Sequence, residues 1–405
     1  MTSTIRRNSA TAALFALAIG SFGIGMTEFV VMGLLPDLAQ DLLPAAWATN
    51  SETAIAHAGV LISLYALGVV IGAPTIAGSV ARFPRHRVMI ALALALTVFN
   101  AFTFLAPSFE WMAVSRLLAG LPHGAYFGIG ALVASDVLGP GRRAQGVAFV
   151  LTGLTVANVV GVPVGTFLGQ HYGWRATFMV VAAIFALATV CIAWSVPRHE
   201  GSPERTLRAE LRVFRIGQVW LTLAIGAIGF GGFFAVNSYV APLVTEVAHA
   251  PSWAVPLVLV ISGVGMTIGN LVGGRLADRD LRRTMLGAFV STAVVLALIG
   301  LTAQWIVVLA ALMFALSFGG SILAPAIQTR LMDVAEDNQS IAAALNHSSL
   351  NVGNSLGAFF GGTVIAAGWG FVAPAWVGVV MALVGLALTA VGFRAVRRHR
   401  VLAPA

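Results

Sequence analysis

The sequence has no lysine and a single cysteine, Cys191, among its 405 residues. One cysteine excludes an internal disulfide, so oxidative cross-linking does not stabilise the chain. Charged residues make up only 9% of the sequence, against about 25% in a typical soluble domain. The sequence also lacks an HExxH zinc motif and a Walker phosphate loop, and its polar loops are too short for a catalytic domain. We therefore expect neither a soluble protein nor an enzyme.

Long apolar runs dominate what remains. Hydrophobic residues make up 59% of the chain, and the mean hydropathy is +0.92. A helix needs about 20 apolar residues to cross roughly 30 Å of hydrocarbon, and twelve stretches reach about that length. They cover approximately 11–35, 57–80, 88–107, 110–137, 144–170, 175–196, 216–243, 253–275, 284–302, 304–329, 341–367 and 371–393. The pattern predicts an all-α membrane protein with twelve transmembrane helices, the first of which is too long for a signal peptide.

The basic residues follow membrane topology. The net charge of +8 and the isoelectric point near 11 come from 23 arginines. Of these, 21 lie near the two termini, in the central polar segment or in alternate loops, while Arg116 lies within a span and Arg175 in an opposite loop. Basic loops stay on the cytoplasmic side. We predict a multi-pass protein of the plasma (cytoplasmic) membrane with both termini cytoplasmic, surrounded by lipid and without a nucleic-acid partner.

The chain divides near its midpoint. The segment 198–215 is the only sizeable polar stretch, and six apolar runs lie on either side of it. We interpret it as a cytoplasmic linker between an N-terminal bundle, 1–197, and a C-terminal bundle, 216–405. Because one chain holds both bundles, we expect a functional monomer.

The two bundles repeat one design. NVVGVPVG at 158–165 aligns with NSLGAFFG at 354–361 at an offset of 196, matching one asparagine and two glycines. The loop ARFPRHR at 81–87 aligns with DRDLRRT at 278–284 at an offset of 197. Parallel repeats of this kind build a large class of secondary transporters.

Several of these segments resemble conserved motifs of the major facilitator superfamily. GRLADRDLRR, from Gly274 to Arg283, is similar to the loop pattern G-x-L-A-D-R-x-G-R-R, with Leu281 in place of the second glycine. SRLLAG at 115–120 resembles the fourth-span motif with its buried arginine, and GVPVG at 161–165 resembles the Gly-Pro motif of antiporters. Together with TEFVVMGLLPDLA and AALNHSSLNVGNSLGAFFGG, they resemble the twelve-span drug:proton antiporter branch, which includes arabinose-type and chloramphenicol-type efflux proteins.

The resemblance implies the major facilitator fold, with two pseudo-symmetric six-helix bundles around a central cavity. It implies alternating access driven by a proton gradient, without a cofactor or a metal. It also implies charged gating loops, whose members here would be Arg82, Asp278, Arg279 and Arg282. Ala81 stands where the second-half loop has Asp278, so the first-half loop departs from the pattern. Its arginines equally fit a role as positive anchors at the cytoplasmic surface.

An acid near the end of the first span is the leading candidate for coupling. An ionised carboxylate inside a bilayer is costly, so such an acid usually has a role or a partner. Glu28 lies roughly 10 Å before the end of its span, and Arg116 lies at a similar depth in the fourth span. If the two spans adjoin, as the resemblance implies, opposite charges reduce the cost of burying both. His123, two turns after Arg116, shares its helix face, and histidine exchanges protons near neutral pH in water.

We therefore interpret Glu28 as the coupling acid, Arg116 as its electrostatic modulator, and His123 as a proton carrier or substrate contact. Structural alternatives exist for all three. Glu28 could form a purely structural salt bridge, Arg116 could tie several helix ends together, and His123 could make a helix-to-helix hydrogen bond.

Small residues recur every four positions in two spans. Gly161, Gly165 and Gly169 do so in the fifth span, and Gly353, Gly357 and Gly361 in the eleventh. Such spacing allows another helix to pack closely, and we expect these smooth faces to let the two bundles rock against each other. Pro163 is expected to bend the fifth span.

Polar and aromatic residues of the second half are candidates for a substrate cavity. Asn237 stands near aromatic residues in the seventh span, and a mixture of this kind suits amphipathic organic molecules. The candidate set is Asn237, Phe234, Tyr239, Asn346 and Asn351. Asn354 repeats Asn158, which favours a structural helix-to-helix bond for that pair.

The sequence therefore predicts a proton-coupled antiporter that exports small organic molecules, either drugs such as phenicols or sugars and other metabolites. The alternative is an uncoupled or symport carrier for a sugar or nucleoside, which would tolerate neutralisation of Glu28.

Overall fold

The computed structural model describes residues 2–80, 83–139, 143–198, 215–335 and 339–402, and every regular element in these ranges is a helix. In the first half of the chain they are α1 (Thr2–Gly33), α2 (Leu35–Leu42), α3 (Pro44–Thr49), α4 (Ser51–Ala58), α5 (Val60–Val80), α6 (Arg85–Phe104), α7 (Phe109–Leu138), α8 (Arg143–Val156), η1 (Ala157–Gly161), α9 (Val162–Tyr172) and α10 (Trp174–Ser195). In the second half they are α12 (Gly217–Ala224), η3 (Ile225–Gly229), α13 (Gly231–Asn237), α14 (Val240–Pro242), η4 (Leu243–Val247), α15 (Ala254–Thr302), α16 (Ile306–Val334), α17 (Gln339–Val364), η6 (Ile365–Trp369) and α18 (Ala373–Leu402).

The predicted all-α membrane fold is confirmed. Within the described ranges, ten helices are long and apolar enough to cross a membrane. One of them, the 49-residue α15, contains two predicted spans, because its only break is the extended backbone of Asp280 (φ −157°, ψ 92°). The predicted eleventh span corresponds to α17, which is not among the ten. The described part of α17 carries the polar side chains of Asn346, His347, Asn351 and Asn354.

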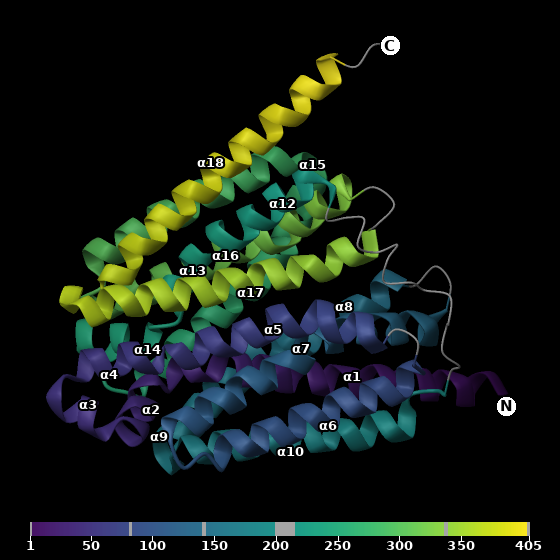
Figure 1. Ribbon diagram of the computed structural model, residues 1–405, viewed down its shortest axis with the longest axis horizontal. Coiled ribbons are helices and arrows are strands. Elements are labelled where there is room, and N and C mark those ends of the chain that lie inside the picture. Colours follow the sequence, from purple (N-terminus) through teal and green to yellow (C-terminus); the bar gives the residue numbers. More distant parts are fainter. Residues whose placement is uncertain (1, 81–82, 140–142, 199–214, 336–338, 403–405) are drawn as a thin grey trace.

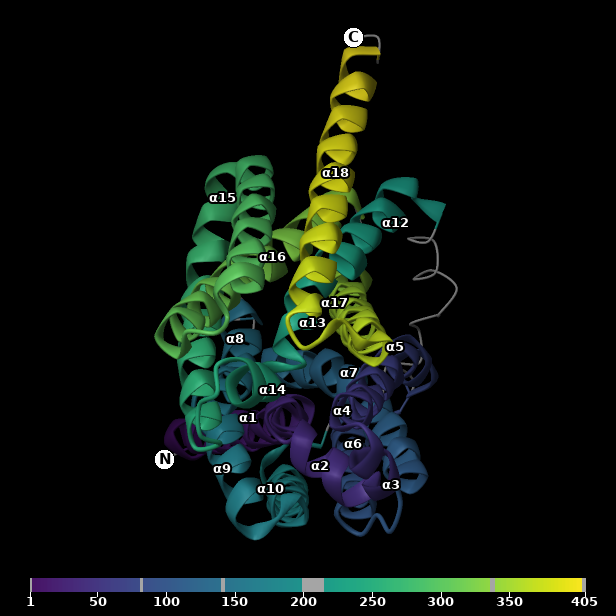
Figure 2. The same ribbon diagram turned by 90° about the vertical axis from the view of Figure 1, so that its left-hand side faces the viewer.

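The helices form two groups that lie side by side (Figures 1 and 2). We call α1 to α10 the first half and α12 to α18 the second half. Both ends of the chain lie at the same end of the molecule, while α2, α3, α4 and α14 gather at the opposite end, which we call the distal end (Figure 1). The proposed linker 198–215 falls mostly outside the described residues.

Two helix pairs form the seams between the halves. At the first seam, α5 packs along α17, and two serines bond reciprocally. Ser63 Oγ donates to the Ser355 carbonyl, and Ser355 Oγ donates to the Ser63 carbonyl, each at 3.1 Å. At the second seam, α15 packs against η1 and α9. Here a Cβ added to Gly263 would lie 2.3 Å from the Asn158 carbonyl oxygen, so only glycine permits this approach.

The glycine rows pack closely, as predicted, but the expectation that they form the sliding surface between bundles is wrong. A Cβ on Gly161 or Gly165 would meet Met26, and α1 belongs to the same half. A Cβ on Gly357 would lie 2.4 Å from the Gly231 carbonyl oxygen, again within one half. A Cβ on Gly361 would likewise meet the neighbouring α13 and the residues that follow it. These rows therefore hold each bundle together.

The fifth span is irregular just before its proline. The residues Ala157–Gly161 form a π-helical turn, and Pro163 lies in the first turn of α9. A proline has no N–H to donate to the preceding turn, and π-helical turns accommodate such interruptions. The irregularity lies at the second seam, beside Gly263.

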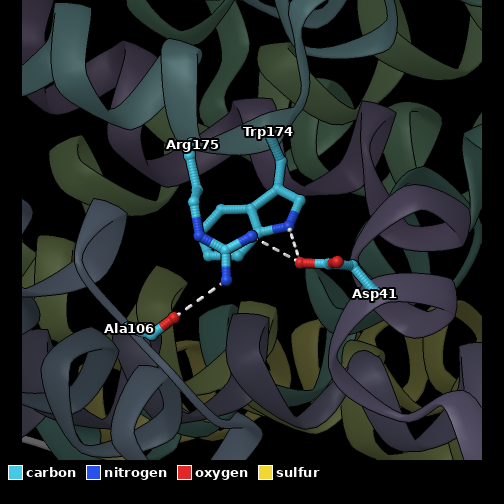
Figure 3. Close-up of polar contacts among 4 residues, drawn as sticks. All are labelled: Asp41, Ala106, Trp174 and Arg175. Carbon is cyan, nitrogen blue, oxygen red and sulfur yellow. Dashed lines mark hydrogen bonds and ion pairs between the residues drawn. The ribbon is translucent and has the colours of Figure 1, made fainter.

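Polar contacts fasten the distal end of the first half (Figure 3). Asp41 accepts hydrogen bonds from Arg175 Nη1 at 2.6 Å and from Trp174 Nε1 at 2.8 Å. Arg175 Nη2 also donates to the Ala106 carbonyl at 3.0 Å, and its guanidinium lies 4.2 Å from the Trp174 ring centroid. Partial burial acts to raise the pKa of Asp41, but the bonds from Arg175 and Trp174 outweigh it and hold the pKa below its usual range. Arg175, the lone basic residue of the opposite loops, therefore joins α10 to α2 and to the chain before α7.

The predicted gating loops differ between the halves. Arg82 lies outside the described residues. Its neighbour Arg85 forms an ion pair with Asp136 that links α6 to α7. In the second half, the side chains of Asp278, Arg279 and Arg282 are exposed. The ion pair seen there joins Arg283 to Asp280 at 3.2 Å, within a single turn.

Candidate functional site

Glu28 is buried in α1 at the interface between the halves, with only 6% of its surface exposed. Asn354 Nδ2, from α17 of the other half, donates to Glu28 Oε1 at 3.3 Å. The Asn354 Oδ1 atom is buried and has no hydrogen-bond partner in the described structure. The acid of the first half is thus tied directly to an amide of the second.

Arg116 of α7 is completely buried close to this acid. Its Nη1 atom donates to Thr27 Oγ1 at 2.9 Å, and its guanidinium lies 4.2 Å from the Tyr65 ring centroid. Thr27 in turn donates to Asn100 Oδ1 at 2.6 Å, so three helices hold the arginine. Its charge acts on Glu28 electrostatically, as the predicted similar depth implies. The structure nevertheless forms no ion pair between these two residues, and Arg116 Nε and Nη2 have no hydrogen-bond partners within the described ranges.

His123 lies farther along α7 among aromatic rings. The Tyr65 hydroxyl and His123 Nδ1 lie 3.1 Å apart, within hydrogen-bond distance. The ring of Phe127 is 5.3 Å from that of His123 and stacks on His347 of α17, with centroids 5.4 Å apart and an interplanar angle of 3°. The histidine predicted in the first half therefore connects, through one phenylalanine, to a histidine of the second half.

Two of the predicted substrate residues contact the first half directly. The Phe234 ring stacks on Phe29 across the interface, with centroids 6.4 Å apart and an interplanar angle of 1°. Phe230 and Phe233 pack against Phe234 at 5.3 and 5.0 Å, so four phenylalanine rings form one group. One helical turn away, Asn237 Nδ2 donates to the sulfur of Met32 at 3.1 Å. An aromatic group with an amide at its edge thus spans the interface.

The other predicted amides lie on or beside α17. Asn346 Nδ2 donates to Gln328 Oε1 of α16 at 3.4 Å, and Asn351 Nδ2 donates to the His347 carbonyl of its own helix at 3.0 Å. The Oδ1 atoms of both asparagines are buried without a partner among the described residues. Polar acceptors of this kind are costly in a dry interior, so they are available to a bound polar molecule.

Tyr239 lies apart from these residues, at the distal end. Its side chain is fully buried, and its hydroxyl donates to the Ala358 carbonyl at 2.7 Å. A Cβ on Gly59 of the first half would lie 2.2 Å from that hydroxyl oxygen, and one on Gly362 would lie 2.5 Å from it. In this conformation the tyrosine fills the contact between the halves rather than facing open space.

The structure thus brings Glu28, Arg116 and His123 into one buried region. It adds Tyr65, which the sequence analysis missed, and it gives Asn354 a partner other than the expected one. Tyr65 links the arginine to the histidine, and Asn354 binds the acid. A tyrosine within an apolar span was a usable signal for the first, because the chain has only four tyrosines. Across the described residues, no group of three histidine, cysteine, aspartate or glutamate side chains gathers to hold a metal ion.

Two bundles of membrane-spanning helices with a buried acid between them define a secondary transporter. The chain belongs to the Major Facilitator Superfamily, whose model matches residues 17–279 and 233–404. Membership confirms both the resemblance seen in the sequence and the expectation of a transporter rather than an enzyme. The two overlapping matches cover almost the whole chain.

Known relatives extend over most of the chain. It is 36% identical over 358 residues to the inner membrane transport protein YdhP of Escherichia coli K12, covering 88% of this chain and 90% of the relative. It is 30% identical over 368 residues to a chloramphenicol resistance protein of Streptomyces lividans, covering 89% and 91%. Among solved structures, a D-xylose-proton symporter superposes with a TM-score of 0.75 over 94% of this chain and 97% of its own, at 16% identity. That last similarity concerns the fold alone.

Proposed function

We propose that this protein is a proton-coupled antiporter that exports small organic molecules across the cytoplasmic membrane. Glu28 is the coupling acid in this proposal, and the observation that carries it is the burial of that acid between the two halves. A buried carboxyl that contacts the opposite half can exchange a proton only when the halves part. Its protonation is therefore linked to the movement that alternating access requires.

Arg116 and His123 support the acid in different ways. The buried guanidinium of Arg116 offsets part of the cost of an ionised Glu28 without binding it in this conformation. His123 is connected to Arg116 by the Tyr65 side chain, which contacts both residues. We assign to His123 the transfer of protons between Glu28 and the end of the molecule that carries the termini.

The aromatic group formed by Phe29, Phe230, Phe233 and Phe234 favours amphipathic substrates with an aromatic or other flat apolar part. Asn237, Asn346 and Asn351 supply hydrogen bonds for the polar part of such a molecule. The relative named for chloramphenicol resistance supports drug export, and the inner membrane relative supports location in the cytoplasmic membrane. The distribution of arginines supports a cytoplasmic location for both termini.

The test is substrate-dependent proton release from inverted membrane vesicles energised to an acid interior. Wild-type protein and Glu28→Gln are compared over a panel of phenicols, sugars, nucleosides and dyes. Glu246→Gln is the matched control, because Glu246 is an exposed acid of η4 at the distal end. We expect one substrate class to release protons with wild type and the control but not with Glu28→Gln. Equal transport by all three proteins without proton movement would contradict the proposal and establish a facilitator.

A further inference from the structure

The Glu28 carboxyl faces two sets of hydrogen-bond donors that belong to different halves. One is the Asn354 amide of the second half, which it contacts here. The other is the Arg116 guanidinium of the first half, whose Nε and Nη2 atoms are buried and without partners in the described structure. A buried donor left unsatisfied costs free energy, and more so when it is charged. Two donor atoms of the arginine can therefore bind an acceptor that is not in contact with them in this conformation.

The Asn354 amide likewise has only one of its two polar atoms hydrogen-bonded in the described structure. Its Nδ2 atom donates to Glu28 Oε1, whereas its Oδ1 atom is buried and without a partner among the described residues. An ionised carboxylate only accepts hydrogen bonds, so it has no proton to offer Oδ1. A neutral carboxyl both accepts and donates, and it can satisfy the two ends of one amide at once. The amide therefore matches the protonated acid better than the ionised one.

We propose that the protonation state of Glu28 controls its contact with Asn354 of the second half. The neutral acid pairs with Asn354 across the interface, and the ionised acid turns to Arg116 within its own half. The inference rests on the proposed role of Glu28 as the coupling acid. The switch is local, because Asn354 already contacts the carboxyl and Arg116 is near enough to act on it electrostatically. Among the described residues, the charged or titratable side chains that act on Glu28 are Arg116 of α7 and Tyr65 of α5, and α17 faces it with a neutral amide.

The location of the amide gives this switch a mechanical consequence. Asn354 is followed directly by Ser355, whose side chain and backbone make both reciprocal bonds of the first seam. Losing the contact between Glu28 and Asn354 weakens α17 against the first half beside those two bonds. The distal end, where α4 also packs on η6, then opens more readily. Proton binding closes the distal end, and proton loss frees it.

The direction agrees with export coupled to proton entry. When the distal end is open to the outside, Glu28 takes up a proton, pairs with Asn354 and closes that end. When the proton leaves toward the other side, the ionised acid turns to Arg116, and the return movement becomes possible with substrate bound. The halves are thus joined most firmly by the state that carries the proton inward.

The test measures the distance between the halves as a function of pH, with no substrate or gradient present. Spin labels are attached at Thr53→Cys on α4 and Ala366→Cys on η6, both exposed at the distal end, in a Cys191→Ala background. Electron–electron double resonance then gives the populations of short and long distances in purified protein. In the otherwise unchanged protein we expect the short-distance population to fall as the pH rises, with the ratio changing by at most about tenfold per pH unit for one coupled proton.

Four further variants test the assignment. Glu28→Gln mimics the neutral acid, so we expect the short distance at every pH. Asn354→Leu removes the amide that pairs with Glu28, so the short-distance population should no longer depend on pH. Asn158→Leu, at the equivalent position of the first half, should keep that dependence. Asn354→Gln keeps an amide at this position and should recover part of the pH dependence. This result would distinguish loss of the amide contact from a folding defect.

A pH response that persists in Asn354→Leu, or that disappears equally in Asn158→Leu, would overturn the inference. So would pH-independent distances in the labelled protein itself. If proton-coupled transport is intact but the distances do not depend on pH, only the proposed switch is wrong. If the distances depend on pH but substrate releases no protons, the proposed antiport is wrong and the switch stands.

Discussion

The two halves repeat one sequence design but bring different chemistry to their interface. The first half contributes Glu28, Arg116 and His123, all buried and all ionisable. The second half contributes asparagines of α17, a stacked phenylalanine and one histidine, His347. At the contact around Glu28, the first half therefore supplies the ionisable groups and the second half supplies a neutral amide. This difference is what the proposed switch between Glu28 and Asn354 depends on.

The largest expected effect comes from removing the buried arginine of the first half. Arg116→Leu removes the charged hydrogen bond to Thr27, worth about 1.5 to 3 kcal/mol, and the buried stack on Tyr65, worth about 2 kcal/mol, so we expect the largest loss of stability here. Thermal unfolding of the purified protein in detergent measures the loss, and proton-coupled uptake is measured on the folded fraction. Arg330→Leu is the control, because Arg330 is the buried arginine of α16 in the second half. Loss of proton coupling in Arg330→Leu as well would show that both halves carry the function.

The next effect distinguishes the two seams. Gly263→Val places side-chain atoms against the Asn158 carbonyl, and such overpacking costs about 1 to 3 kcal/mol. Ser63→Ala at the first seam removes one hydrogen bond of a reciprocal pair, for which we expect about 0.5 to 1.5 kcal/mol. Thermal midpoints and transport rates of both variants check the order. A larger loss in Ser63→Ala would mean that the bonds between α5 and α17, rather than the close approach of α15, dominate the contact between halves.

A smaller effect tests the loops at the end that carries the termini. Arg85 is paired with Asp136, whereas their equivalents at an offset of 197, Arg282 and Asp333, are both exposed and do not pair. Double-mutant cycles with alanine at each pair should give a coupling of up to about 1 kcal/mol in the first half, because that pair is partly exposed. We expect none in the second half. Equal coupling in both would place a second ion pair in the conformation that dominates in solution.

The smallest effect depends on pH and concerns the distal end of the first half. Asp41 has a lowered pKa, so its contribution is present above its unfolded pKa of about 3.9 and is lost as the pH falls through the folded value. Its side chain is 47% exposed, so screening limits the contribution to less than about 1 kcal/mol. Arg175→Ala should flatten this part of the curve of thermal midpoint against pH.

Asp37, four residues earlier, should show the opposite sign. Burial raises its pKa to about 6, although its own backbone N–H acts to lower it. Ionisation between its unfolded pKa and that value therefore costs stability as the pH rises. Asp37→Asn should raise the thermal midpoint at neutral pH, and an unchanged midpoint would show that the carboxyl is solvated.

The sequence was sufficient for the spans, and it indicated that Glu28 and Arg116 lie near enough to interact, because hydropathy and the rise per residue are properties of single segments. It was not sufficient for their partners. Asn354 was expected to form a structural bond as the repeat of Asn158, yet it binds an acid 326 positions away, since the two halves meet there. The glycine rows were assigned to the wrong surface for the same reason: spacing reveals a smooth face but not the neighbour that covers it.

The reciprocal bonds between Ser63 and Ser355 have an electrical consequence. Both partners are uncharged, so breaking and remaking this seam moves no net charge through the membrane. Moving one elementary charge across a potential of 100 mV is worth about 2.3 kcal/mol. In the proposed mechanism, this work is done on the proton that Glu28 carries. The membrane voltage would then act on the bound proton, whereas the serine bonds of the first seam would not respond to it.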